Sequence, residues 1–135
     1  MALLDEVATY LISQGVGSSA STAAWTVNKG FLPPSPDKAI GVFETGGFRN
    51  DGHHDATVDR PTFQLLVRGD AFGYSTARTK LTAARTALEL IGNENMGGRR
   101  YIHVQAQHEA LAIGQDENSR PRLVMNFTAL RSRTS

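Results

Sequence analysis

The side chains best suited to chemistry lie in one polar stretch, Asn50 to Asp59, which reads NDGHHDATVD. Imidazole nitrogens and carboxylate oxygens are ligands for divalent metals. Here they belong to Asp51, His53, His54, Asp55 and Asp59. Adjacent histidines rarely converge on one metal without ligands from elsewhere, and nothing in the sequence brings His103 or His108 to this stretch. We therefore favour a solvated or partner-contacting loop, with a metal site as the alternative.

Other catalytic patterns are missing from the sequence. It has no cysteine, which excludes disulfides, thiolate metal sites and cysteine nucleophiles. It has no Gly-x-Ser-x-Gly nucleophile turn, no phosphate-binding Gly-x-x-x-x-Gly-Lys-Ser/Thr and no dinucleotide-binding glycine motif. Adjacent Asp116 and Glu117 suit a hairpin turn better than a catalytic pair, and His103 is expected on a strand surface. The sequence predicts neither an enzyme nor a cofactor.

Length, charge and composition limit the other classes of protein to which this chain could belong. A chain of 135 residues fits one domain, residues 1–135. Fourteen Lys and Arg against thirteen Asp and Glu give a net charge of +1, which does not suggest a dedicated nucleic-acid binder. The start, MALLDEVATYLISQG, carries acidic residues where a signal peptide needs basic ones, and no run is long enough to span a membrane. We expect a soluble protein made in the cytosol.

The arginines could act in assembly. Arg78 and Arg85 are seven residues apart and share one face of a predicted helix, and Arg99 and Arg100 precede a predicted strand. Isolated arginines among neutral residues suit subunit contacts better than a DNA groove. We favour a solvated surface for most of the arginines, including Arg131 near the C-terminus, and keep a role in subunit contacts as the alternative.

Periodicity predicts the elements of the first half. Apolar residues spaced as in a one-faced helix run from Leu3 to Ile12, and Gly15 stops the helix. Strands are predicted in residues 24–33, in 39–44 and in 61–69. Between the last two, the glycine-rich segment Gly46 to Arg60 is longer than most connections, so we expect a long mobile loop there.

The second half contains the strongest helical signal. Apolar residues recur from Tyr74 to Ile91 at intervals of three and four, with Asp70 as the predicted N-cap. Strands follow in residues 99–110, with Tyr101 outward, and on both sides of the turn at 116–119. The predicted fold is therefore α+β: a mostly antiparallel sheet with a short N-terminal helix and one long helix packed on one face.

Four stretches together resemble the tail-terminator, or tail-completion, proteins of long-tailed bacteriophages, including those described as minor capsid proteins. They are LLDEVATYLISQGVG, GFLPPSPDKAIGVFETGG, RPTFQLLVRGDAFGYSTARTKLTAARTALE and IGQDENSRPRLVMNFTALR. The resemblance covers nearly the whole chain in the family's order, although each stretch encodes fold rather than chemistry. The loop FRNDGHHDATVD matches no pattern of the family.

The resemblance implies a virion protein of the tail or neck, assembled in the host cytoplasm. It implies a hexameric ring that caps the head-proximal end of the tail tube, ends tube polymerisation and docks on the head. Its partners would be its own copies, the tail-tube protein, the head–tail connector and DNA crossing the lumen without sequence-specific binding. It implies no catalysis, cofactor or membrane. The alternatives are another neck component, such as a head-completion or connector protein, and a small metal-dependent enzyme.

Within that reading, we expect the Gly46–Arg60 loop to order against a neighbouring subunit or the tube. The candidate contact residues are the loop side chains and the helix and strand arginines. They are Phe48, Arg49, Asp51, His53, His54, Asp55, Asp59, Arg78, Arg85, Arg99 and Arg100.

Overall fold

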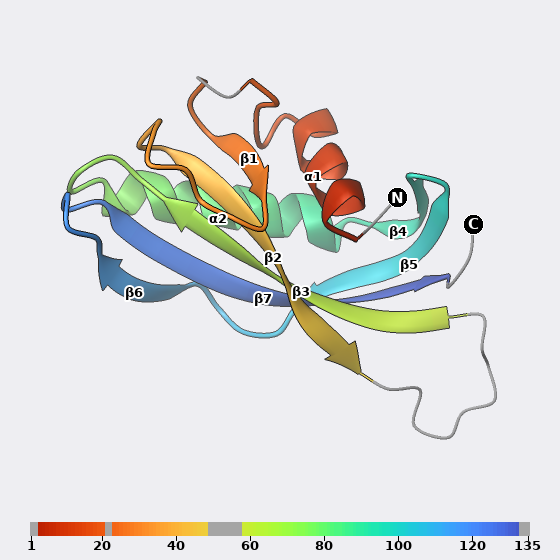
Figure 1. Ribbon diagram of the computed structural model, residues 1–135. Coiled ribbons are helices and arrows are strands. Elements are labelled where there is room, and N and C mark those ends of the chain that lie inside the picture. Colours follow the sequence, from red (N-terminus) through yellow and green to blue (C-terminus); the bar gives the residue numbers. More distant parts are fainter. Residues whose placement is uncertain (1–2, 21–22, 49–57, 133–135) are drawn as a thin grey trace.

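A computed structural model describes residues 3–20, 23–48 and 58–132 (Figure 1). Within these ranges the chain forms two helices and seven strands. In chain order they are α1 (Leu3–Ser13), β1 (Thr26–Lys29), β2 (Ala39–Phe48), β3 (Val58–Arg68), α2 (Tyr74–Glu89), β4 (Gly92–Met96), β5 (Arg99–Ala106), β6 (Leu111–Gln115) and β7 (Pro121–Ser132).

The seven strands form one sheet in the order β1-β2-β3-β7-β5-β4, with β6 paired to β7 beside β5. β1 and β2 are parallel. The other paired strands are antiparallel, which agrees with the prediction of a mostly antiparallel sheet. Helix α1 contacts β1 and β2 at one end of this order and β4 at the other. The sheet must therefore curl around the helix, and Figure 1 shows this curvature.

The predicted fold class is wrong. Among the described residues the protein is mostly β, with 46% in strands and 23% in helices, and its sheet is a curled half-barrel with two helices rather than a sheet with one long helix packed on a face. One reason is that β-bulges interrupt the register of β2, β5 and β6 and so increase bending and twist. A second is that β4 was not predicted, because GNENM carries no alternating apolar pattern.

The core draws on both helices and on the inner face of the sheet. Alternate residues of β3 and β7 point into it and have no exposed surface or almost none: Phe63, Leu65, Val67, Leu123, Met125, Phe127 and Ala129. The rings of Phe63 and Phe127 stack with centroids 5.2 Å apart. Burial of large side chains on one strand face is the main stabilising term for such a sheet.

The predicted helices are confirmed, but one cap is not. Ala77, Leu81, Ala84 and Leu88 of α2 are fully buried, as their spacing predicts. The N-cap is Gly73 instead of the predicted Asp70. Asp70 begins a turn in which its carbonyl accepts a hydrogen bond from the Gly73 amide, so its carboxylate does not cap the helix.

The direction of Tyr101 in β5 was predicted wrongly. Tyr101 is fully buried, although simple alternation placed it outward with His103 and Gln105. A bulge between Tyr101 and His103 adds one residue to β5 opposite β7, so the alternation changes phase there. His103 and Gln105 are exposed, as predicted.

The β2–β3 hairpin extends beyond the predicted strands. Gly47 pairs with Pro61 and Phe48 with Arg60, so strand structure occupies both ends of the segment predicted as a loop. The Thr45 hydroxyl donates to the Thr62 hydroxyl at 2.7 Å across this pair. Figure 1 shows the hairpin pointing away from both helices, which suits a projecting contact element. Residues 49–57 lie outside the described residues.

Candidate functional site

The start of β3, at the loop end of the β2–β3 hairpin, is tied to the core by a buried ionic network. Arg131 on β7 donates from Nη1 to Glu6 Oε1 at 2.8 Å and from Nε to Asp59 Oδ1 at 3.1 Å. The Tyr101 hydroxyl donates to Glu6 Oε1 at 2.6 Å. Glu6 Oε2 makes no hydrogen bond within the described chain, but Arg99 Nε lies 3.7 Å away. The Glu6 carboxylate thus joins α1 to β5 and β7, and Arg131 extends the network to Asp59 at the start of β3.

Burial and charge shift the ionisation of this network. Burial, reinforced by Glu6, raises the pKa of the Tyr101 phenol. Burial alone would lower the pKa of Arg131, but its hydrogen bonds and attraction to Tyr101 and Asp59 outweigh this, so the pKa is raised. Arg131 is therefore held as a cation and Tyr101 as a neutral donor at neutral pH.

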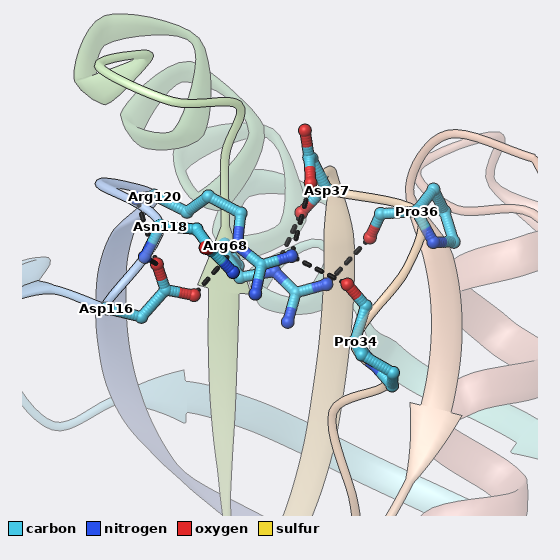
Figure 2. Close-up of polar contacts among 7 residues, drawn as sticks. All are labelled: Pro34, Pro36, Asp37, Arg68, Asp116, Asn118 and Arg120. Carbon is cyan, nitrogen blue, oxygen red and sulfur yellow. Dashed lines mark hydrogen bonds and ion pairs between the residues drawn. The ribbon is translucent and has the colours of Figure 1, made fainter.

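A second buried arginine joins the β6–β7 turn to the loop between β1 and β2 (Figure 2). Arg120 donates from Nε to Asp116 Oδ2 at 2.8 Å and from Nη1 to the Pro34 carbonyl at 2.7 Å. The same Nη1 lies 3.2 Å from Asp37 Oδ1. Burial would raise the pKa of Asp116, but hydrogen bonds from the backbone of Arg120 and Asn118 and from the Arg120 side chain lower it.

Arg68, at the end of β3, lies beside Arg120 and holds the same loop (Figure 2). It donates from Nε to the Asp37 carbonyl at 2.9 Å and from Nη2 to the Pro36 carbonyl at 2.7 Å (Figure 2). Burial, followed by repulsion from Arg120, lowers the pKa of Arg68. The loop at 34–37 is therefore clamped by two arginines, because its carbonyl oxygens have no strand partners of their own.

A shallow groove of about 330 Å³ lies between Trp25 and α2, lined also by hydroxyl side chains of the helix. Lys80 Nζ lies 5.2 Å from the centre of the Trp25 ring and donates to the Val16 carbonyl at 2.9 Å. Burial lowers the pKa of Lys80. These contacts fasten the segment between α1 and β1 to α2.

The structure does not gather the sequence-predicted contact residues into one site. Arg49, Asp51, His53, His54 and Asp55 lie outside the described residues, and Phe48 is placed only as the end of β2, opposite Arg60. Among the others, Asp59 and Arg99 meet in the network around Glu6.

The other three arginines predicted as contact residues, Arg78, Arg85 and Arg100, take no part in the buried networks and bond to side chains near them. On α2, Arg78 lies 3.4 Å from the Tyr74 hydroxyl. Arg85 forms ion pairs with Glu89 and Glu109, each at 3.0 Å. Arg100, exposed at the start of β5, donates to Asn93 at 3.1 Å.

Arg131 was wrongly interpreted as a solvated surface residue, and sequence reasoning missed Glu6, Arg68 and Arg120. Two of the four carried a usable signal. Glu6 lies beside Leu3 and Tyr10 on the apolar stripe of α1, and Arg131 continues the inward alternation of β7. A charged residue at an inward position predicts a partner, because an unpaired buried charge is too costly.

The metal alternative gains no ligands from the described part of the chain, where no cluster of three or more His, Asp or Glu side chains could hold an ion. Both ring nitrogens of His108 have hydrogen-bond partners within the fold: Nδ1 lies 2.6 Å from the Glu109 carbonyl oxygen, and Nε2 accepts from the Asn126 amide at 3.2 Å. Also within these ranges, neither helix is long and apolar enough to cross a membrane.

Comparison with known proteins identifies the family. Residues 10–133 match the model of a family described as bacteriophage tail terminator protein. Among solved structures, a chain from the virion of a native gene transfer agent particle has 19% identity and a TM-score of 0.66, with 97% of this chain and 95% of that chain covered. A second solved chain has 15% identity and a TM-score of 0.57, with 98% and 95% covered.

At these identities the two structures show a shared fold. No curated protein matches the sequence significantly. The family match spans the end of α1, the whole of α2 and all seven strands, and it confirms the family resemblance of the sequence. The chain belongs to the bacteriophage tail terminator family and is a structural protein of the phage tail.

Proposed function

We propose that this protein caps the head-proximal end of the tail tube as a hexameric ring, ends tube polymerisation and offers the surface on which the head docks. The observation that carries the proposal is the family match over residues 10–133. Its role is structural and not catalytic. Its partners are further copies of the chain, the tail-tube protein and the head–tail connector, and DNA crosses the lumen without sequence-specific contacts.

The architecture supports this role physically. A capping subunit must resist deformation while its contact elements project, and here ion pairs of Arg131 with Asp59 and Glu6 hold the start of β3 to the core. The hairpin projects from the sheet away from both helices (Figure 1). We propose that the segment Gly46–Arg60 orders against a neighbouring subunit or the tube. A head-to-tail ring needs two different surface patches on each subunit, and ring closure prevents open-ended growth.

Electron microscopy of particles made without the protein tests the role. Loss of a terminator gives overlong or headless tails, because nothing stops the tube or attaches it. Loss of a head-side connector instead leaves filled but unstable heads beside tails of normal length. The second result would contradict the terminator role and favour another neck component.

A further inference from the structure

β6 is an edge strand whose outer side is exposed. One side of β6 pairs with β7, with Leu111 opposite Val124 and Ala112 opposite Leu123. The other side has no strand partner within the described part of the chain. All five residues of β6 are exposed, and Leu111 and Ile113 retain 55% and 41% of their accessible surface. Such an edge presents free backbone donors and acceptors together with apolar side chains.

Leu111 also ends an apolar row on the outer face of the sheet. Gly41 is opposite Leu66, Leu66 is opposite Val124, and Val124 is opposite Leu111. Side chains that pair across antiparallel strands lie on the same face, here the face opposite the core. The ring of Phe43 lies over Gly41, where an added Cβ would stand 2.7 Å from it. A strand added to β6 would extend this row and bury its exposed end.

The two other edges of the sheet differ from β6. β1 is shielded, because the Val27 amide donates to the Ser18 carbonyl and the Ser18 amide donates to the Trp25 carbonyl. β4 is open but polar, and its first four residues, 92–95, are exposed. β4 and β6 are thus the open edges of the described sheet. Both are five residues long, and they lie at opposite ends of the molecule, β6 at the lower left and β4 at the upper right of Figure 1.

Charge and apolar surface make the two open edges complementary. Near β6, Glu109 pairs with Arg85 and Asp116 with Arg120, which leaves Glu117 as the acidic residue without an ion pair among the described residues. Near β4, Arg99 lies 3.7 Å from Glu6, and the exposed Arg100 donates to the neutral Asn93, with Glu94 as the one acidic residue of the segment 90–100. Leu90, which directly precedes this strand region, is 73% exposed. Glu117 beside β6, Arg100 beside β4 and the exposed leucine on each surface favour one surface docking on the other over either docking on itself.

We propose that β6 of one subunit pairs edge to edge with β4 of the next copy of the chain, so that the sheet continues across the subunit boundary. The contact joins two different patches at opposite ends of the subunit, and repetition of the contact can close a ring. This inference rests on the ring of the proposed function and names the surfaces that build it.

Disulfide trapping tests the pairing, since the natural chain has no cysteine. Ile113→Cys is combined with Glu94→Cys or with Asn95→Cys, because a disulfide needs Cα atoms about 4.4–6.8 Å apart and two positions sample the register. The rings are assembled with tail-tube protein, oxidised mildly and run on non-reducing gels. We expect at least one double variant to give a ladder of three to six chains, while each single-cysteine variant stays monomeric.

The outcomes separate this inference from the function on which it rests. Dimers of the Ile113→Cys variant alone would mean that β6 pairs with itself, which overturns the proposal. Rings of normal mass without a ladder would overturn the β6–β4 contact and leave the terminator role standing. Absence of any ring, with or without tube protein, would contradict the proposed function as well.

A charge substitution gives an independent readout. Ile113→Lys places a cation on an exposed strand that faces the arginine side of the next subunit, so we expect folding to be unchanged and ring assembly to weaken at least about tenfold. Gln105→Lys, on the exposed side of β5, is the matched control and should assemble normally. An Ile113→Lys protein that assembles as tightly as this control would overturn the proposal.

Discussion

Arg131 and Glu6 are 125 residues apart in sequence, and the guanidinium Nη1 of Arg131 lies 2.8 Å from Oε1 of Glu6 in the protein core. Their side chains are 11% and 0% exposed. The pair ties the N-terminal helix to the last strand, and Asp59 connects it to the β2–β3 hairpin. The contact therefore anchors the start of β3 to the core.

Removing one partner of this pair should be costly. Glu6→Gln removes the buried carboxylate and leaves the Arg131 cation with Asp59 alone, and we expect the free energy of unfolding to fall by about 3 kcal/mol. Lys29→Met breaks the exposed Lys29–Asp5 ion pair and should cost at most about 1 kcal/mol. Urea denaturation of both variants measures the difference. Similar losses for the two would show that the buried network does not hold the fold.

Tyr101 should make stability fall at high pH. Burial raises its pKa, whereas an unfolded tyrosine ionises near pH ~10. Above that pH the folded chain therefore binds more protons than the unfolded chain, so the free energy of unfolding decreases as pH rises. Tyr101→Phe should flatten this decrease, and Tyr74→Phe, at an exposed position, should leave it unchanged. Denaturation curves between pH 8 and about 11 measure it, and equal slopes in wild type and Tyr101→Phe would contradict the assignment.

Arg120 should control the order of the loop at 34–37. Arg120→Lys keeps the charge but cannot donate from one planar fork to Asp116 and to the Pro34 carbonyl together. We expect a loss of about 1.5–3 kcal/mol and faster amide hydrogen exchange in residues 34–38 and 116–120. Arg78→Lys, on the exposed face of α2, is the control. Unchanged exchange in Arg120→Lys would mean that the loop is held by Arg68 alone.

The hairpin segment should be needed for assembly and not for folding. We expect replacement of residues 49–57 with a short glycine–asparagine linker to change the free energy of unfolding by less than about 1 kcal/mol, since loop length affects closure entropy weakly. Ring formation or tail capping should be lost. Calorimetry reports the first result, and complementation of terminator-deficient tails reports the second. A linker variant that caps tails normally would rule out the loop as a contact.

Sequence reasoning succeeded where one periodicity governs a whole element. The intervals of three and four in α2 predict the burial of Ala77, Leu81, Ala84 and Leu88, and alternation in β7 predicts the inward face from Leu123 to Ala129. It failed where the backbone departs from the regular period. The bulge in β5 turned the Tyr101 side chain to the face opposite the predicted one. The polar strand β4 has no apolar alternation by which it could be predicted.

The fixed polar contacts were harder to predict, because each depends on long-range pairing. Glu6 and Arg131 occupy apolar positions of their elements, a signal that predicts some partner but not which one. Arg68 and Arg120 hold carbonyl oxygens of a loop, and carbonyl partners leave no trace in the sequence. The curl of the sheet follows from bulges and from contacts of α1 with both ends of the strand order, which no single segment encodes.

The most direct test of the terminator role is the mass of the purified protein by light scattering, with and without tail-tube protein. The account predicts a species of six chains, either in free solution or on addition of the tube protein. A protein that stays at one chain mass, 14.6 kDa, and ignores the tube would contradict it.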